Sequence, residues 1–224
     1  MKKRVQQILT DLERVQENLI ALSDDIWLEI DHNNSDTLEE EVELKIQFNT
    51  KLVEYNDIAG DIASLIEHFT KVSPQPADVG TGGTLEYTRI ITELERTCCY
   101  TLEEDFTFKR PYGFIFQDRA YKGINTWRNL YHLFCKQLAA KDLSSFQKFI
   151  QNREARNVRG GAIFAKEADN LRAPLKITDD IYAEGNLSAN SIRDRIKVLL
   201  SAFGIDSQEV SLYLCQDRSL AEES

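Results

Sequence analysis

Four residues have side chains that could bind zinc. His132 and Cys135 are three apart and would share one face of a helix. The adjacent Cys98 and Cys99 could complete the ligand set. Zinc modules typically use two ligand pairs, each separated by about two to four residues, and this spacing does not occur here. The sequence therefore predicts no metal and no cofactor, and the four cysteines, Cys215 included, are expected to be reduced core residues in a cytoplasmic protein.

A second group could support the chemistry of a metal-dependent nuclease. Asp179, Asp180 and Glu184 are carboxylates that could hold Mg²⁺, and Lys176 or Lys166 would then act near the phosphate. The usual nuclease pattern places a lysine at the second position after a carboxylate, but an asparagine follows Glu184 there. The pair at 179 and 180 is equally well explained as a turn between strands. A nuclease is kept as an alternative, and no catalytic residue is assigned, because motifs of hydrolases and dinucleotide-binding enzymes are also missing.

Six cations could contact the phosphates of a nucleic acid. Three belong to a glycine-ended loop and three to a later helix, whose first N–H groups could add an anion site: Arg153, Arg156, Arg159, Arg193, Arg195 and Lys197. Loop and helix together could form one basic face. The alternative is that these charges only keep the surface solvated.

The helix with the second set of cations is the densest local signal in the chain. A short strand at 181–183 leads into a turn, Ser188 is a good N-cap, and the helix should run to Phe203 and stop at Gly204. One side of this helix is apolar, and the cations project from the others. We therefore expect it to pack on a C-terminal sheet and to expose a basic surface.

The region 84–215 is expected to form a small, basic α+β domain. Hairpins and helices are mixed there without the regular alternation of a doubly wound sheet. We expect a helix at 84–100, a β-hairpin within 106–124, helices starting at 125 or 126 and at 144 or 145, and strands at 162–165, 175–178, 181–183 and 210–214. An acidic tail follows at 216–224.

The N-terminal region 1–72 carries two coiled-coil seams with apolar residues spaced alternately by three and four. The first is Val5, Ile8, Leu12, Val15, Leu19, Leu22 and Ile26; the second is Phe48, Leu52, Tyr55, Ala59, Ile62, Ile66 and Phe69. The first helix should end near Ile30 and the second should start at Thr37, where Glu40 completes a capping box. The sequence therefore predicts an antiparallel helical hairpin.

A two-helix hairpin of this length leaves apolar residues beside the seam, among them Leu9, Trp27 and Ile58. Such a surface is commonly completed by a second copy, which predicts a homo-oligomer with a four-helix association. The alternative is packing on the chain's own C-terminal domain. The expected oligomer interface comprises Val5, Ile8, Leu12, Val15, Leu19, Leu22, Ile26, Leu52, Tyr55, Ile62 and Ile66.

Charge and composition separate the two regions. Residues 1–72 hold 7 Lys/Arg against 16 Asp/Glu, whereas residues 106–200 hold 17 against 9. The segment 73–83 contains two prolines and three glycines without periodicity, which is typical of a linker. A basic domain could bind DNA or RNA by displacing counterions from phosphates, or it could attract an acidic protein or the acidic hairpin. No apolar run is long enough to cross a membrane.

One stretch resembles a small C-terminal α+β domain that recurs in uncharacterised bacterial proteins, some of them encoded near restriction and other antiphage systems. The resemblance is carried by Tyr-x-Glu-x-Asn-Leu-Ser-Ala-Asn-x-Ile at 182–192, by Ile124–Trp127, and by Leu-x-x-Pro at Leu171–Pro174. It spans about residues 108–214. The resemblance implies a bacterial cytosolic setting and a defence-linked sensor or assembly role, and it transfers no catalytic residue.

These features predict a non-enzymatic, self-associating binding module with nucleic acid as the leading partner and a link to antiphage defence. The alternatives are a protein–protein adaptor or regulatory subunit of a larger complex, and the metal-dependent nuclease.

Overall fold

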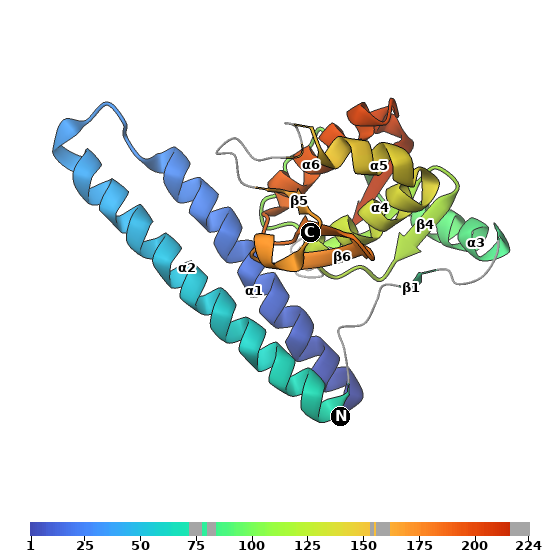
Figure 1. The fold of residues 1–224 in the computed structure, drawn as a ribbon, viewed down its shortest axis with the longest axis horizontal. Helices are drawn as coiled ribbons and strands as arrows, with labels where there is room; N and C mark the ends of the chain where they lie inside the picture. Colours follow the sequence, from blue (N-terminus) through green and yellow to red (C-terminus); the bar gives the residue numbers. More distant parts are fainter. Residues whose placement is uncertain (72–77, 80–83, 153–154, 156–161, 216–224) are drawn as a thin grey trace, which may run out of the picture. The chain divides into compact units, whose positions relative to one another are not determined.

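The computed structural model describes residues 1–71, 78–79, 84–152, 155 and 162–215 (Figure 1). The chain divides into two compact units, Met1–Gln75 and Pro76–Ser224. The first is helical and the second mixes helices with antiparallel strands, so the expected α+β class with an N-terminal hairpin is confirmed. Within the described residues, no helix is both long and apolar enough to span a membrane.

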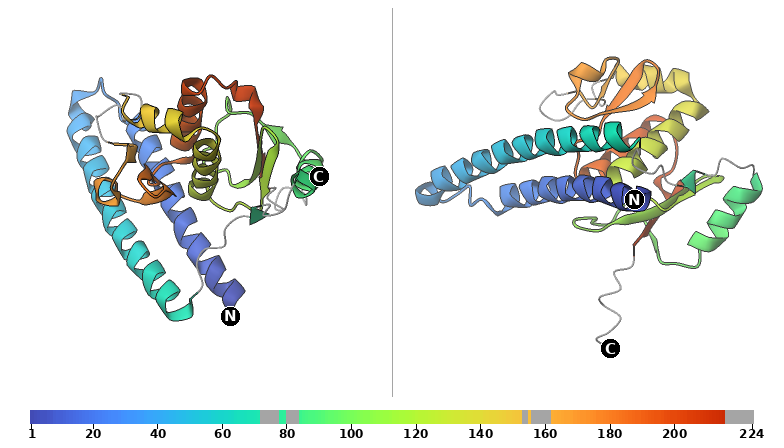
Figure 2. Two further views of the ribbon diagram at one scale, coloured as in Figure 1. Left: turned by 45° about the vertical axis from the view of Figure 1, so that its right-hand side comes forward. Right: turned by 90° about the horizontal axis from the view of Figure 1, so that it is seen from below.

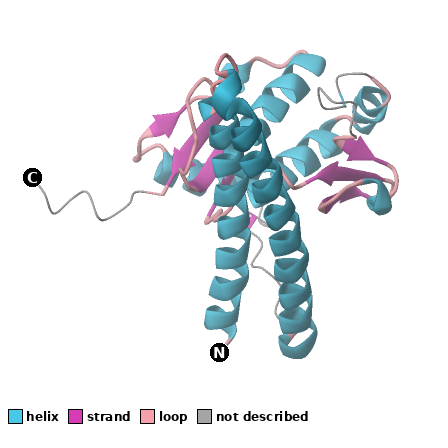
Figure 3. Cartoon of the chain, turned by 90° about the vertical axis from the view of Figure 1, so that its left-hand side faces the viewer, coloured by secondary structure: helices cyan, strands magenta, loops and turns pink. Residues whose placement is uncertain are grey.

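The first unit is a hairpin of α1 (Lys2–Glu29) and α2 (Ser35–Thr70), which run antiparallel along their length (Figure 3). The end of α1 agrees with the sequence, but α2 begins two residues before the expected Thr37. The reason is the cap: Asn34 Oδ1 accepts a hydrogen bond from Asp36 N at 3.1 Å, and Asn34 is a better N-cap than the threonine.

A polar layer joins the two helices of the hairpin near its loop end. Ser23 Oγ donates to Asn49 Oδ1 at 2.7 Å, and the buried Lys45 donates to Ser23 Oγ at 2.5 Å and to the Ser23 carbonyl. Farther along, Tyr55 Oη donates to Leu12 O at 3.2 Å. A buried polar group in an apolar seam favours one register, because any shift would leave it without partners.

The second unit contains two antiparallel sheets. The larger has the order β1 (Asp78–Val79), β4 (Arg119–Lys122), β3 (Pro111–Phe116), β8 (Val210–Leu214) and β2 (Cys99–Tyr100). The smaller has the order β5 (Phe164–Ala165), β7 (Ile181–Glu184) and β6 (Pro174–Thr178). The expected linker at 73–83 thus includes a two-residue strand, in which Asp78 and Val79 pair with Lys122 and Tyr121.

Helices cover both faces of the larger sheet (Figure 2). On one face, α4 (Trp127–Lys141) and α6 (Ala189–Ala202) pack on Phe114, Phe116 and Leu212, and α5 (Leu143–Ile150) extends the same core. On the other face, α3 (Thr84–Leu94) places Ile90 and Leu94 against Ala120 and Tyr213. Short 3₁₀ helices lie at Ala168–Asn170 and Ser207–Glu209.

The predicted caps of α4 and α6 are confirmed. Thr126 Oγ1 accepts from Asn129 N at 3.2 Å, Ser188 accepts from Ser191 N at 3.3 Å, and Gly204 follows α6 with a φ of 64°. The start of α5 was predicted wrongly, because its N-cap is Asp142 and not one of the serines after it. A carboxylate accepts more strongly from helix N–H groups than a hydroxyl does.

Two further boundaries differ from the expectation. The helix predicted at 84–100 ends at Leu94, and Cys99 and Tyr100 form an edge strand opposite Tyr213 and Leu212. The strand predicted from 106 begins only at Pro111. In both places the pairing with β8, which is distant in sequence, decides the local structure.

Candidate functional site

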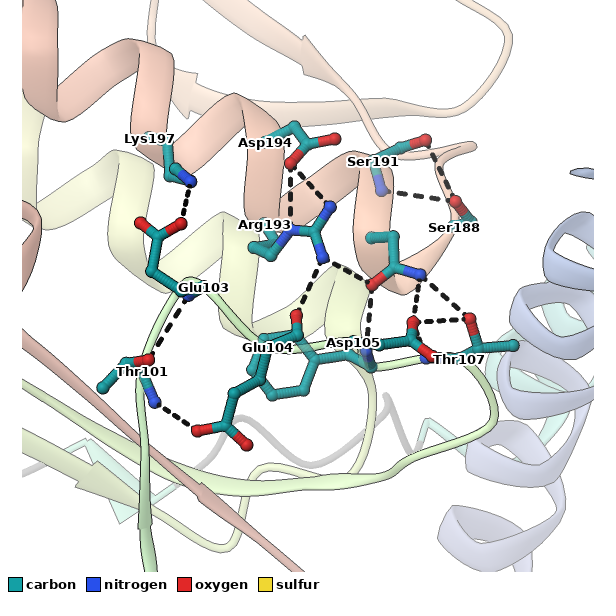
Figure 4. A network of polar contacts seen from close by, with 12 residues as sticks. Thr101, Glu103, Glu104, Asp105, Thr107, Ser188, Ser191, Arg193, Asp194 and Lys197 are labelled. Atoms are coloured by element: carbon teal, nitrogen blue, oxygen red, sulfur yellow. Dashed lines mark hydrogen bonds and ion pairs between the residues drawn. The ribbon is translucent and has the colours of Figure 1, made fainter.

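Two of the three cations expected to bind phosphate on α6 are used within the chain (Figure 4). Arg193 Nη1 donates to Glu104 O at 2.8 Å and to Asn190 Oδ1 at 3.2 Å, and its guanidinium also pairs with Asp194. Lys197 Nζ lies 2.7 Å from Glu103 Oε2. These side chains fasten the loop at 101–107 to the helix, so α6 does not expose a row of uncommitted cations.

Asn190 completes this attachment. Its Oδ1 accepts from Phe106 N at 2.9 Å, and its Nδ2 donates to Asp105 Oδ1 at 2.6 Å and to Thr107 Oγ1 at 2.9 Å. Asn190 therefore satisfies donors and acceptors of three consecutive loop positions. The asparagine inside the resembling pattern has a structural role in this unit.

The same network should make stability depend on acid pH. Hydrogen bonds from the side chain of Asn190 and from Thr107 lower the pKa of Asp105 to about 2. An unfolded aspartate titrates at about pH 4, so the network contributes stability above that pH and loses it as pH falls toward about 2. We expect Asp105→Asn to remove this part of the pH dependence in urea unfolding measured from about pH 2 to 7. The exposed Asp118→Asn is the matched control, and identical pH profiles for Asp105→Asn and wild type would contradict the prediction.

The other expected cations are not brought into this network. Arg195 is half-buried on α6. Arg153, Arg156 and Arg159 lie outside the described residues. A joint basic face of loop and helix therefore stays a prediction.

The three carboxylates considered for a nuclease each bond to different groups of the chain. The buried Glu184 accepts from three backbone N–H groups: Oε2 from Arg172 at 2.8 Å, and Oε1 from Ala173 at 3.1 Å and Asn186 at 2.8 Å. Asp179 pairs with Lys176 at 2.9 Å, and Asp180 accepts from Thr178 Oγ1 at 2.9 Å. In the part of the chain that the structure describes, no three His, Cys, Asp or Glu side chains gather as a metal site would need.

The zinc set considered from the sequence is also dispersed. Cys135 is fully buried, and burial raises its pKa far above the usual range of a thiol, whereas Cys98 and Cys99 are exposed. The expectation that all four cysteines are core residues is therefore wrong for this exposed pair. His132 Nε2 lies 2.8 Å from Lys176 O and holds β6 to α4, beside a hollow of about 360 Å³. Burial lowers the pKa of this histidine.

The heptad seam of α1 is divided between two directions. Val5, Leu12, Leu19 and Ile26 are half-buried, whereas Ile8, Val15 and Leu22 are 43%, 44% and 39% exposed. In a two-helix hairpin, the seam residues that face the other helix are buried by it. The seam residues of α1 that stay exposed are therefore available for another contact.

Seven of the exposed apolar residues of the two helices lie on one face of the hairpin. Leu22 directly precedes the inward Ser23, and Ile58 directly precedes the inward Ala59. Leu22 and Ile58 are therefore rotated away from the helix–helix contact in the same direction about their own helix axes. Antiparallel helices are related by a twofold axis normal to their plane, so equal offsets point to the same side. We call this set the apolar face: Ile8, Val15, Leu22, Ile58, Ile62, Leu65 and Phe69.

Phe108 lies in a turn and not in a strand of the expected hairpin. The β-hairpin expected within 106–124 would include Phe108, but this residue is 55% exposed with a φ of 56° in a turn closed by Lys109 N donating to Phe106 O at 3.0 Å. Glycine or asparagine is preferred at such a position, and a bulky residue there costs about 1–3 kcal/mol.

Comparisons with known proteins give no match: no family model, no curated protein and no solved structure is similar to this chain. The resemblance of residues 108–214 to defence-linked bacterial domains therefore stays a prediction.

Proposed function

We propose that this chain is a non-enzymatic, self-associating binding module, in which the apolar faces of two hairpins pack together and the α+β unit contacts a partner. The apolar face carries this proposal. Ile58, Leu65 and Phe69 are 58%, 70% and 81% exposed, and Ile8 and Val15 on the other helix are 43% and 44% exposed. A single exposed apolar residue needs no explanation, but a contiguous stripe indicates an interface.

The size of the face supports a second copy as its occupant. A helix of 28 residues is about 42 Å long, and two helices side by side are about 20 Å wide, so one face offers on the order of 800 Å². Stable interfaces bury about this area on each partner. Two identical faces related by a twofold axis would form a four-helix bundle with an isologous interface.

The net charge of the hairpin makes its self-association depend on salt. The hairpin is strongly acidic, with 16 Asp/Glu against 7 Lys/Arg in residues 1–72, so two copies repel each other at low ionic strength. Salt screens this repulsion while apolar contacts persist. Self-association should therefore strengthen with salt, opposite to the behaviour of an ion-paired complex.

Self-association is tested by light scattering on the full chain at about 10–100 µM and two salt concentrations. We expect a dimer or higher oligomer for wild type and a monomer for the double variant Ile62→Glu/Leu65→Glu, because charges in the centre of an apolar interface are costly to bury.

The hairpin offers a matched control on its opposite side. Ile46 and Val53 are 59% and 49% exposed and directly follow inward residues, so Ile46→Glu/Val53→Glu adds the same charges away from the apolar face. This variant should associate as wild type does. A monomeric wild type, or equal loss of association in both double variants, would overturn the proposal.

In this proposal the α+β unit is the part that contacts a partner. Dimerisation places two copies of its binding surface on one particle and raises the apparent affinity through effective concentration. Because Arg193 and Lys197 bond to the loop at 101–107, we expect the contact surface to lie elsewhere on the unit.

A further inference from the structure

Four neighbouring side chains of the α+β unit project into solvent just before and within the start of β3. They are two aromatic residues and two cations: Phe108, Lys109, Arg110 and Tyr112. Phe108 is 55% exposed and Tyr112 is 39% exposed, which is unusual for large aromatic side chains beside a core rich in phenylalanine. Sequence spacing alone did not indicate this cluster.

The backbone holds both rings outward. Phe108 has a φ of 56° at a turn position that favours glycine or asparagine. Tyr112 lies at a register shift, where Pro111 pairs with Leu214 and Gly113 with Tyr213. Bulges of this kind redirect a side chain and are frequent near functional sites. Two separate backbone irregularities therefore expose the two aromatic rings, which the stability of the fold does not require.

The segment is also held firmly from both sides. Trp127 Nε1 donates to Lys109 O at 2.8 Å, and Cys215 N donates to Arg110 O at 2.9 Å. The preceding Phe106 is fixed by Asn190. A surface that is ordered before binding loses little conformational entropy on contact, which favours affinity.

Arg110 is the cation of the segment that is left available, whereas Lys109 lies over two aromatic rings and interacts electrostatically with Asp105. The carboxylates before it are engaged: Glu103 with Lys197, Glu104 with Thr101 N, and Asp105 with Asn190. Lys109 Nζ lies 5.9 Å from the centres of the Tyr100 and Phe106 rings. Among the residues that the structure describes, Arg110 has no ion pair or side-chain hydrogen bond.

We propose that the segment Phe108–Tyr112 is a contact surface for single-stranded nucleic acid, in which the two rings stack on bases and the two cations contact phosphates. Exposed aromatic rings next to Lys or Arg are the usual composition of such surfaces, and stacking needs unpaired bases. A duplex hides its base faces and would use the cations alone. This inference rests on the binding-module part of the proposed function and not on self-association of the hairpin.

The experiment is fluorescence anisotropy of the full chain with labelled 12-nucleotide DNA, RNA of the same sequence, and the corresponding DNA duplex, at about 50 mM salt. We expect the single strands to bind more tightly than the duplex. Phe108→Asn should lower the affinity for single strands about 5- to 100-fold, and Phe108→Trp should retain it, because the lost quantity is stacking. Arg110→Ala should reduce the slope of log affinity against log salt by about 0.7.

Three controls separate this inference from other effects. Phe108→Asn relieves the turn and should be at least as stable as wild type in urea, so a loss of binding cannot be attributed to unfolding. Lys148→Ala removes an exposed cation from α5 and should bind as wild type does. The monomeric Ile62→Glu/Leu65→Glu variant should keep the preference for single strands, which distinguishes failure of self-association from failure of binding.

Three outcomes would overturn the inference: no binding of single strands at low salt, equal affinity for the duplex, or unchanged affinity in Phe108→Asn. Binding of polyglutamate as tight as that of nucleic acid, and insensitive to Phe108, would likewise overturn it and assign the surface to an acidic protein.

Discussion

Replacing Glu184 with alanine is expected to lower the free energy of unfolding by about 3–5 kcal/mol. The buried carboxylate accepts from three backbone N–H groups around the start of β6 and the end of β7, at 2.8–3.1 Å. Hydrogen bonds to a charged group contribute about 1.5–3 kcal/mol each, and a buried donor that loses its acceptor adds a desolvation penalty. Urea unfolding followed by circular dichroism measures the change.

The neighbouring carboxylates provide the comparison. Asp180→Ala should change stability by less than about 0.5 kcal/mol, because Asp180 is exposed and bonds only to side chains nearby. Glu184→Gln should fall between the two, since one amide oxygen still accepts. If Glu184→Ala proves as stable as Asp180→Ala, the structural role of this carboxylate is wrong.

This expectation also affects how a nuclease is tested. A carboxylate saturated by three N–H groups is poorly suited to hold a metal ion, and loss of cleavage in Glu184→Ala would report unfolding. Asp180→Ala, which leaves the fold intact, is the informative variant in a metal-dependent cleavage assay.

Gly113→Ala is the second change with a large expected effect. A Cβ on Gly113 would lie 2.5 Å from the backbone oxygen of Tyr121 and 3.1 Å from Leu94 Cδ2. The first contact is with the paired strand β4 and the second with α3, so neither side of the sheet can yield without losing core contacts. We expect a loss of at least about 3 kcal/mol in the free energy of unfolding, from forced displacement of packed backbone.

Gly60→Ala is the matched control for this substitution. Among the described residues, nothing lies within 4 Å of a Cβ built on Gly60, which is inside α2. The alanine should therefore stabilise the hairpin by about 1 kcal/mol through helix propensity. Equal effects of the two substitutions on thermal unfolding would contradict the steric explanation.

Local sequence determined the elements that depend on neighbouring residues. The two hairpin helices, the helix starts at Thr126 and Ser188, and the stop at Gly204 follow from periodicity and from caps whose partners are at most a few residues away. These interactions form within single elements, so their signals are complete in a short stretch of chain. The α+β class follows from the same elements.

Tertiary structure alone decided which side chains were left available for function. Arg193 appeared as a free cation until the loop at 101–107 was placed beside it, and Glu184 appeared as a candidate ligand until three backbone N–H groups converged on it. The heptads of α1 did not reveal which half would face α2, and the exposed Tyr112 lies at a register shift in the pairing between β3 and the distant β8. Each of these outcomes is set by contacts between segments far apart in sequence, which residue spacing does not encode.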